Sequence, residues 1–191
     1  MAIFDIEKDE LLGLSDTLLE ELIARLAEAD VAACGHSPAQ VRWSGSINAP
    51  DGGVDVHVQL PVEQFSSGYI ERPDTVFQAK KHKMLRADIL REMAPSGVLS
   101  PMIYEQAAKG GSYIIVSLDE DCSPSMLAER VRAMQEAVRH DPCHADLHLA
   151  FYDRAKLAQW IRQYPSVMLW VNRILGRGFR LAAIWRMELP S

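Results

Sequence analysis

The feature that most constrains the fold is an alternating segment, VDVHVQL at residues 54–60, which directly follows two glycines. Its side chains divide into two rows: Val54, Val56, Val58 and Leu60 on one face, and Asp55, His57 and Gln59 on the other. A period of two is typical of a β-strand with one buried face. Residues 75–82 form the next strand-like segment along the chain.

Segments with helical spacing and further strands follow along the chain. We expect helices within 15–30, 84–97, 100–111, 123–140, 154–165 and 166–176, and strands at 39–47, 112–118 and 147–153. The segment SYIIVSL at 112–118 is the most apolar and should be the central strand. This order predicts an α/β fold in which helices cover a mixed sheet. The connection at 61–74 is long for a compact domain, and long connections often carry function.

Length and composition predict one domain of ordinary globular type. The chain has 191 residues, of which 48% are hydrophobic and 24% charged, and we place its core within about residues 15–155. No run of about 18 apolar residues occurs, which argues against a membrane span. The acidic start, MAIFDIEKDELL, lacks a secretory signal pattern. Three scattered cysteines, Cys34, Cys122 and Cys143, favour the reducing cytoplasm.

The net charge of the chain and its distribution limit the classes of function that we consider. The net charge of −6 argues against a protein that binds nucleic acid through its overall charge. Positive charge is nevertheless concentrated in one segment, where Lys80, Lys81, Lys83, Arg86 and Arg91 lie within twelve residues. The chain has no glycine-rich loop of the G-x-x-x-x-G-K-[ST] type, so it should not bind ATP through such a loop.

Asp55 is an acid at the start of a strand, directly behind a glycine turn. Taken alone, it could be a solvated strand residue. If the two strands pair, however, Asp55 lies beside Gln78 and Lys80, whose side chains share one face. Mg²⁺ prefers oxygen ligands and keeps several waters, and Asp55, Gln78 and the Ala79 carbonyl would each supply an oxygen. Lys80 would then orient or deprotonate a metal-bound water, or stabilise charge on a phosphate.

The segments DGGVDV at 51–56 and VFQAKK at 76–81 together resemble the PD-(D/E)xK nuclease superfamily, most closely its Mrr-type restriction endonuclease branch, where the motif reads Q-x-K. The resemblance covers roughly residues 15–120. It implies the restriction-endonuclease-like fold, with Asp55 and Gln78 at the metal and Lys80 in catalysis. Such modules often carry a metal-reaching glutamate on the first helix, and LEELI at 19–23 points to Glu20, with Glu21 as the competing choice.

The stretch FYDRAKLAQWIRQYPSVMLWV, residues 151–171, is similar to nuclease modules found at the N-terminus of large bacterial STAND-type NTPases that act in anti-phage defence. In those proteins an ATPase and a sensor follow the nuclease and drive oligomerisation. The resemblance implies that the helices within 154–191 lead toward an NTPase domain that this chain does not contain. The chain would be an effector domain or a free-standing relative.

We therefore expect a cytoplasmic, Mg²⁺-dependent endonuclease, with Mn²⁺ as a substitute ion, that hydrolyses phosphodiester bonds of double-stranded DNA. Lys81, Lys83 and Arg86 would contact the DNA backbone, although Lys81 and Lys83 could instead protect an edge strand from pairing. Cutting both strands requires two sites, which predicts a dimer or a tetramer. The alternatives are a catalytically weak module of the same fold that binds nucleic acid or a partner, and a plain oligomerisation domain.

A second metal hypothesis concerns the segment RHDPCHADLH at 139–148. It contains four residues that could ligate zinc: His140, Cys143, His144 and His148. The segment has one cysteine, and no second pair with finger-like spacing accompanies it. A helix end followed by a loop is therefore the favoured interpretation.

Overall fold

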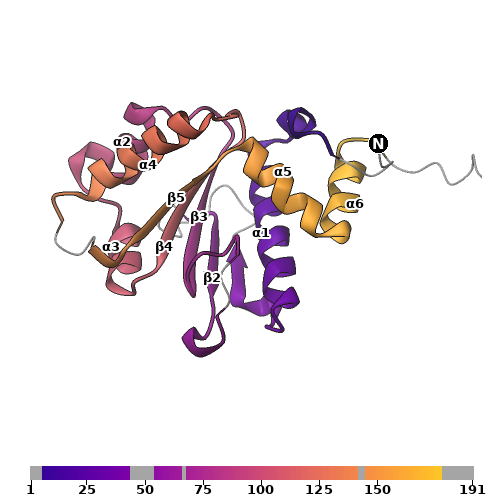
Figure 1. The fold of residues 1–191 in the computed structure, drawn as a ribbon, viewed down its shortest axis with the longest axis horizontal. Helices are drawn as coiled ribbons and strands as arrows, with labels where there is room; N and C mark the ends of the chain where they lie inside the picture. Colours follow the sequence, from indigo (N-terminus) through magenta and orange to yellow (C-terminus); the bar gives the residue numbers. More distant parts are fainter. Residues whose placement is uncertain (1–5, 44–53, 66–67, 142–144, 178–191) are drawn as a thin grey trace, which may run out of the picture.

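The computed structural model describes residues 6–43, 54–65, 68–141 and 145–177 (Figure 1). The described helices are α1 (Asp16–Ala33), α2 (Arg86–Met93), α3 (Pro101–Ala108), α4 (Pro124–Val138), α5 (Arg154–Gln163) and α6 (Pro165–Ile174). The strands are β1 (Val41–Trp43), β2 (Val56–Gln59), β3 (Asp74–Lys80), β4 (Ser112–Ser117) and β5 (His148–Tyr152). The predicted order of helices and strands is confirmed, and a 3₁₀ turn at Lys8–Gly13 was not foreseen.

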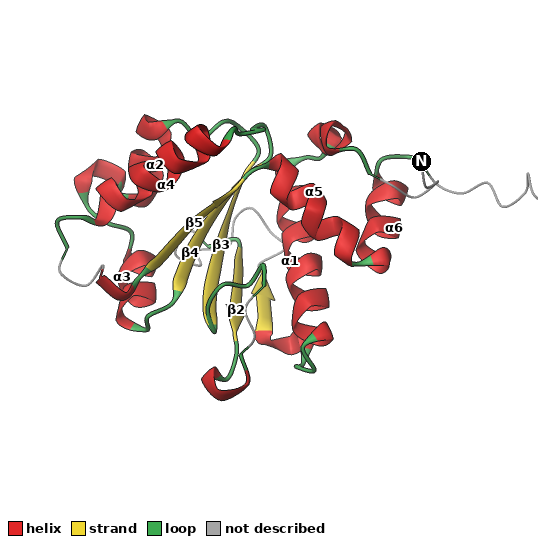
Figure 2. Ribbon diagram, viewed as in Figure 1, coloured by secondary structure: helices red, strands yellow, loops and turns green. Residues whose placement is uncertain are grey.

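The five strands form one mixed sheet in the order β1-β2-β3-β4-β5 (Figure 2). The pairs β1–β2 and β2–β3 are antiparallel, whereas β3–β4 and β4–β5 are parallel. Every residue of β4 is buried, as its apolar sequence predicts. The middle position nevertheless belongs to β3, because β1 and β2 extend the sheet on that side.

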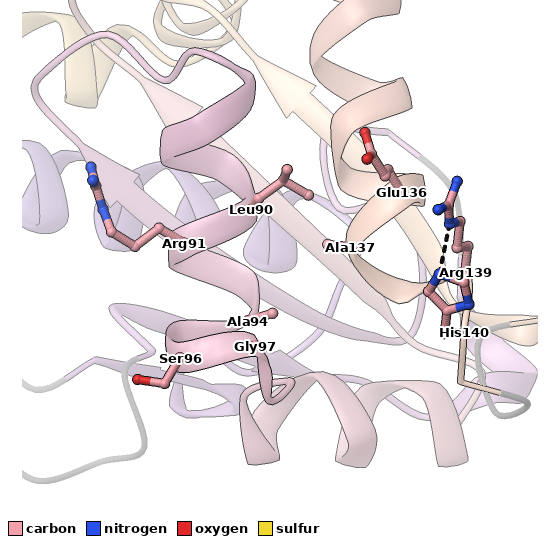
Figure 3. Close-up of a pocket in the computed structure, with 9 residues that line it drawn as sticks. All are labelled: Leu90, Arg91, Ala94, Ser96, Gly97, Glu136, Ala137, Arg139 and His140. Atoms are coloured by element: carbon pink, nitrogen blue, oxygen red, sulfur yellow. Dashed lines mark hydrogen bonds between the residues drawn. The ribbon is translucent and has the colours of Figure 1, made fainter.

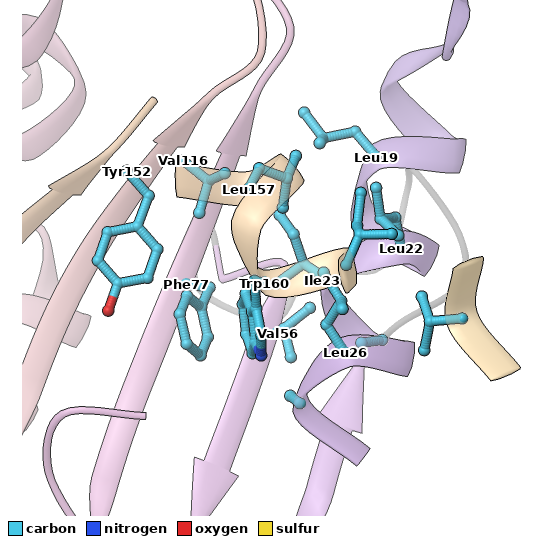
Figure 4. Packing of buried hydrophobic residues seen from close by; sticks show 14 of the residues in the cluster. Leu19, Leu22, Ile23, Leu26, Val56, Phe77, Val116, Tyr152, Leu157 and Trp160 are labelled. Atoms are coloured by element: carbon cyan, nitrogen blue, oxygen red, sulfur yellow. The ribbon is translucent and has the colours of Figure 1, made fainter. Parts of the chain in front are cut away.

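Helices α1, α5 and α6 cover one face of the sheet (Figures 1 and 2). Leucines of α1 and its isoleucine, Ile23, meet Val56, Phe77 and Val116 from successive strands, and Trp160 of α5 fills the space between them (Figure 4). The Trp160 ring stacks on Tyr69 with a centroid separation of 5.0 Å. Burial of these large side chains supplies most of the stabilisation of this layer.

Helices α2, α3 and α4 cover the opposite face (Figure 2). Their core residues include Ile89 and Met93 of α2 and Met134 of α4, which pack with Val76 of β3 and Ile115 of β4. Neighbouring residues of β3 and β4 therefore bury their side chains in opposite layers, as strand alternation requires. The sheet carries a hydrophobic core on each face.

Serine hydroxyls and a glycine terminate three of the described helix ends. The Ser15 and Ser123 hydroxyls accept hydrogen bonds from the third residue beyond each, at the starts of α1 and α4. At the end of α6, Gly176 has a φ of 74°, which a glycine adopts without strain.

The long connection between β2 and β3 is fastened to β5 and α5. The Tyr152 hydroxyl lies within donating distance of two acceptors, the Glu71 carboxylate at 2.6 Å and the Tyr69 carbonyl at 2.8 Å. Lys156 lies 3.3 Å from the same carboxylate, and His148 contacts it as well. Desolvation by itself would raise the pKa of Glu71. These contacts outweigh it and leave that pKa below its ordinary value. These contacts thus hold this part of the connection against β5 and α5.

The described part of the chain contains no helix long and apolar enough to cross a membrane.

Candidate functional site

The candidate site lies at a fork in the sheet, where β2 parts from β3. The paired register of these strands ends at Val56 and Phe77, whereas β3 continues to Lys80 along β4. The chain bends at Asp55, and its Oδ2 atom accepts a 2.6 Å hydrogen bond from the Ala79 N–H. The carboxylate therefore takes the place of a strand partner at the open edge of β3. Asp55 lies beside this part of β3, as the paired strands predict.

The bend also moves Val54 out of its predicted row. Val56 and Val58 pack in the core beneath α1, but Val54 packs with the opposite core cluster. Strict alternation fails here because β2 begins only after the bend. The same bend turns the Asp55 carboxylate toward β3 rather than leaving it on a solvated face.

Asp55 is a strongly perturbed acid. Burial raises the pKa of its carboxyl to about 6, and the negative charges of Glu20 and Glu92 act in the same direction. The Ala79 N–H and the Lys80 ammonium oppose this rise but do not cancel it. Half-buried acids in such surroundings are candidates for functional sites.

The first helix brings Glu20 to this site. Glu20 is half-buried on α1, and its charge contributes to the raised pKa of Asp55. Glu21, the competing choice, accepts hydrogen bonds of 2.9 and 2.7 Å from Arg25 one turn along the helix. The structure therefore places Glu20, rather than Glu21, in electrostatic contact with Asp55.

Gln78 and Lys80 extend from β3 toward the layer that contains α2. They lie on the same face of the strand as Val76, which belongs to that layer's core. Gln78 is 4% exposed, and its Oε1 atom has no hydrogen-bond partner among the described residues. A buried acceptor without a donor is costly. Its free energy would fall if a cation, a water or a substrate group occupied this space.

Two residues that sequence reasoning missed complete the site. The Lys80 Nζ atom lies 2.9 Å from the Glu92 Oε1 atom of α2. Tyr113 of β4 is buried, and the charges of Glu92 and Asp55 add to burial in raising the pKa of its phenol. The described site therefore draws on α1, the β2–β3 fork, β4 and α2.

The sequence contains a signal for Glu92. Ile89 and Met93 are spaced as the buried face of a helix, and both are buried. Glu92 lies three residues after Ile89 and next to Met93, so it falls on the edge of that inward face. An acid at this position is unusual enough to suggest a partner on the sheet.

The basic segment divides into engaged and available cations. Arg86 forms a two-point contact with Glu136 of α4, one arm of which measures 2.8 Å, and Arg91 pairs with Asp88 of its own helix. Lys81 and Lys83 form no ion pair or side-chain hydrogen bond with another described residue. Of the three predicted DNA contacts, Lys81 and Lys83 are thus available, whereas Arg86 already holds a carboxylate.

A cavity of about 400 Å³ lies on another side of α2, between α2 and α4 (Figure 3). Arg91 lies at one side of this cavity in the view of Figure 3, and Arg139 with His140 at the other. The Arg139 Nε atom donates to the His140 ring at 2.9 Å. Neither Asp55 nor Lys80 lines the cavity, so it is separate from the candidate site.

His57 belongs to a network centred on Asp74, at the other end of the β2–β3 pair. The His57 Nε2 atom lies 2.6 Å from Asp74, which also accepts hydrogen bonds from Gln59 and Gln106. These contacts overcome desolvation and hold the pKa of Asp74 well below its usual range. His57 therefore has a structural partner of its own, two strand positions away from Asp55.

The structure gives no support to the zinc hypothesis. Cys143 and His144 lie outside the described residues. His140 accepts from Arg139, and His148 contacts Glu71 at the far end of the sheet's edge strand. Within the described ranges, no three histidine, cysteine, aspartate or glutamate side chains are grouped as they would be in a ready-made metal site.

No protein-family model, curated protein or solved structure matches the chain. The arrangement at the fork therefore carries the functional argument. It combines a perturbed carboxyl, an unpartnered amide oxygen and a half-buried ammonium, which together can hold a cation and act on a phosphate.

Proposed function

We propose that the chain is a metal-dependent endonuclease that hydrolyses phosphodiester bonds of double-stranded DNA, with the site built on a restriction-endonuclease-like fold. The observation that carries this proposal is the convergence of Asp55 and Lys80 at the fork between β2 and β3, where Asp55 has a pKa raised to about 6. The Q-x-K spacing of Gln78 and Lys80 supports the same conclusion.

The residues at the fork fit a divalent cation. With Asp55 ionised, the charges of Asp55, Glu20, Glu92 and Lys80 leave a net excess of two negative charges, which one divalent cation would neutralise. The Gln78 Oε1 atom is a buried oxygen without a donor. Asp55, Gln78, Glu20 and the Ala79 carbonyl would hold Mg²⁺ or Mn²⁺, with waters completing the shell. Only two of these four donors are carboxylates, which accords with the absence of a ready-made acidic cage among the described residues.

The chemistry follows from the positions of these side chains. A bound divalent ion supplies charge stabilisation at the phosphoryl oxygen and a more acidic water. Lys80 orients the attacking water or holds the developing negative charge on the phosphate. Attack in line forms a new P–O bond as the bond to the leaving oxygen breaks. Lys81 and Lys83 support the DNA through its phosphates, without reading its sequence.

The biological setting forms part of the proposal. Cys34 and Cys122 are free thiols, which suits a cytoplasmic protein. The resemblance of residues 151–171 to STAND-type effector modules suggests an anti-phage nuclease that works as a dimer or tetramer. An NTPase and sensor at the C-terminal side would control that assembly.

A second candidate is a catalytically weak module that binds nucleic acid or a partner. One specific observation favours it. Asp55 and Lys80 both have partners within the fold, namely the Ala79 N–H and the Glu92 carboxylate, as expected of residues with structural roles. Such a module would lose DNA affinity gradually as lysines are removed, whereas a nuclease would lose turnover at Lys80 alone.

The test is cleavage of a supercoiled plasmid with Mg²⁺ or Mn²⁺, using the chain alone and fused as a forced dimer. We expect nicked or linear product from the parent and none from Asp55→Ala or Lys80→Ala, with DNA affinity retained in Lys80→Ala. Absence of cleavage from both forms of the parent would contradict the nuclease and favour the binding module.

A further inference from the structure

The contact between Lys80 and Glu92 joins a strand to a helix. Lys80 is the last residue of β3, and Glu92 is the penultimate residue of α2. Their charged atoms are 2.9 Å apart, and the side chains are only 18% and 27% exposed. Glu92 also contributes to the raised pKa values of Asp55 and Tyr113. Its carboxylate therefore faces the candidate site rather than the solvent.

This pair differs from the other ion pairs of α2. The cation of the Arg91–Asp88 pair is 74% exposed, and that of the Arg86–Glu136 pair is 65% exposed. Exposed pairs contribute little and hold their side chains loosely. Because the ammonium of Lys80 is largely shielded from water, its partner has a stronger effect on where it lies.

Lysine needs such a partner if its position matters. Its ammonium is a compact charge at the end of a flexible four-carbon stem, and a free stem carries considerable rotamer entropy. On the open edge of β3, Lys80 without Glu92 could turn toward solvent or toward Asp55. A fixed carboxylate removes these alternatives.

Glu92 is itself held by a rigid support. Ile89 and Met93, on either side of it along α2, are buried in the second core cluster. The approach to α2 is fastened by Met84, whose N–H donates to Glu120 at 2.7 Å. The Glu120 carboxylate in turn pairs with Arg130 of α4 at 3.0 Å in a fully buried setting. The position of Glu92 is therefore set by packing before any substrate arrives.

We infer that Glu92 is a positioning residue, which holds the Lys80 ammonium at the fork of β2 and β3 in the orientation that the reaction requires. That this orientation serves catalysis rests on the proposed nuclease function. That Glu92 holds the ammonium in place rests on the Lys80–Glu92 contact. Glu92→Gln should release the ammonium while leaving the helix intact, because glutamine is as good a helix former as glutamate.

The first test does not need catalysis. The rate at which an amine-directed acylating reagent modifies Lys80 is measured by mass spectrometry in the metal-free protein. We expect Glu92→Gln to raise this rate by about fivefold, since the ammonium loses its half-buried partner. Asp88→Asn is the matched control, because it removes an acid of the same helix whose ion pair is with Arg91, while asparagine keeps an oxygen for the Leu85 N–H that Asp88 binds at the start of α2; it should leave Lys80 modification unchanged.

The second test separates positioning from stability. In plasmid cleavage, we expect Glu92→Gln to lower kcat with little change in KM, and Glu92→Asp to recover part of the loss. An unchanged acylation rate in Glu92→Gln would overturn the inference whether or not the chain cleaves DNA. If the acylation rate rises and the parent does not cleave, the positioning role stands and only the proposed nuclease function fails.

Discussion

At the scale of single residues, two effects on the ionisation of the Asp55 carboxyl oppose each other. Its carboxylate completes the hydrogen bonding of Ala79, which favours an ionised acceptor, but its burial beside other acids disfavours the charge. The second effect is larger, since the pKa rises to about 6. The folded protein therefore holds an acid that is costly to ionise, as is expected of a site that awaits a cation.

This cost predicts a pH-dependent gain in stability for Asp55→Asn. Asparagine keeps an oxygen for the Ala79 N–H and removes the charge. Because the folded pKa lies above the unfolded value of 3.8, the parent loses stability as pH rises from about 4 to about 6, and the loss persists above that range. We expect Asp55→Asn to be more stable by about 2 kcal/mol near pH 7.5 and nearly equal near pH 4.

Denaturant unfolding at both pH values measures this difference. Glu21→Gln is a suitable control, because Glu21 pairs with Arg25 of its own helix. The acid of α1 that raises the pKa of Asp55 is Glu20. An Asp55→Asn protein less stable than the parent near pH 7.5 would show that the carboxylate is a structural cap and not a strained site.

At the scale of elements, close packing decides where α3 meets β3. A side chain at Gly111 would bring its Cβ within 2.2 Å of Gln106 Oε1 and 2.7 Å of the Asp74 carbonyl. Gln106 cannot yield freely, because its amide donates to the Asp74 carboxylate at 2.8 Å. A glycine is therefore required at position 111, because any side chain there would collide with Gln106 and the backbone of Asp74.

Gly111→Ala should therefore lower the free energy of unfolding by roughly 1–3 kcal/mol, the range for overpacked interiors. Gly68→Ala is the control, since its Cβ would meet only Asp30 at an ordinary 3.8 Å. Thermal or urea unfolding of the two variants provides the comparison. Equal stability of Gly111→Ala and the parent would mean that α3 shifts readily away from the sheet.

The connection from β3 into α2 carries the available positive charge. If Lys83 contacts a phosphate, Lys83→Ala should weaken DNA binding equally for all sequences and reduce the slope of log K against log salt by about 0.9. Arg86→Ala should change the slope less, because Glu136 already neutralises this guanidinium. Binding isotherms at several salt concentrations measure both slopes, and an unchanged slope for Lys83→Ala would remove it from the interface.

Much of the element arrangement follows from the sequence, and the exceptions have physical causes. The sequence offered the pairing of residues 54–60 with 75–82 only as a condition for the site, and the structure meets this condition, because β2 pairs with β3 and Asp55 approaches β3. The helical period of α2 places Glu92 at the edge of its inward face, but neither the partner of Glu92 nor the approach of Tyr113 could be assigned, because both depend on how α2 and β4 pack across the sheet. Val54 was misplaced because alternation continues only while a strand is straight.

At the scale of the whole molecule, charge limits what one chain can do. The net charge of −6 repels DNA, and among the described lysines only Lys81 and Lys83 form no ion pair with another described residue. We expect one chain to bind a short duplex at physiological salt no more tightly than about 1 μM, and a forced dimer to bind more tightly. Fluorescence anisotropy measures both. Nanomolar binding of DNA by the monomer would contradict the expectation that tight binding requires two or more chains.

The central claim is that the fork between β2 and β3 holds a divalent cation. Titration of the purified chain with Mn²⁺, followed by electron paramagnetic resonance of the free ion, tests it most directly. We expect one Mn²⁺ site per chain that is lost in Asp55→Asn and retained in Asp88→Asn. Absence of binding in the parent, or equal binding in Asp55→Asn, would contradict it.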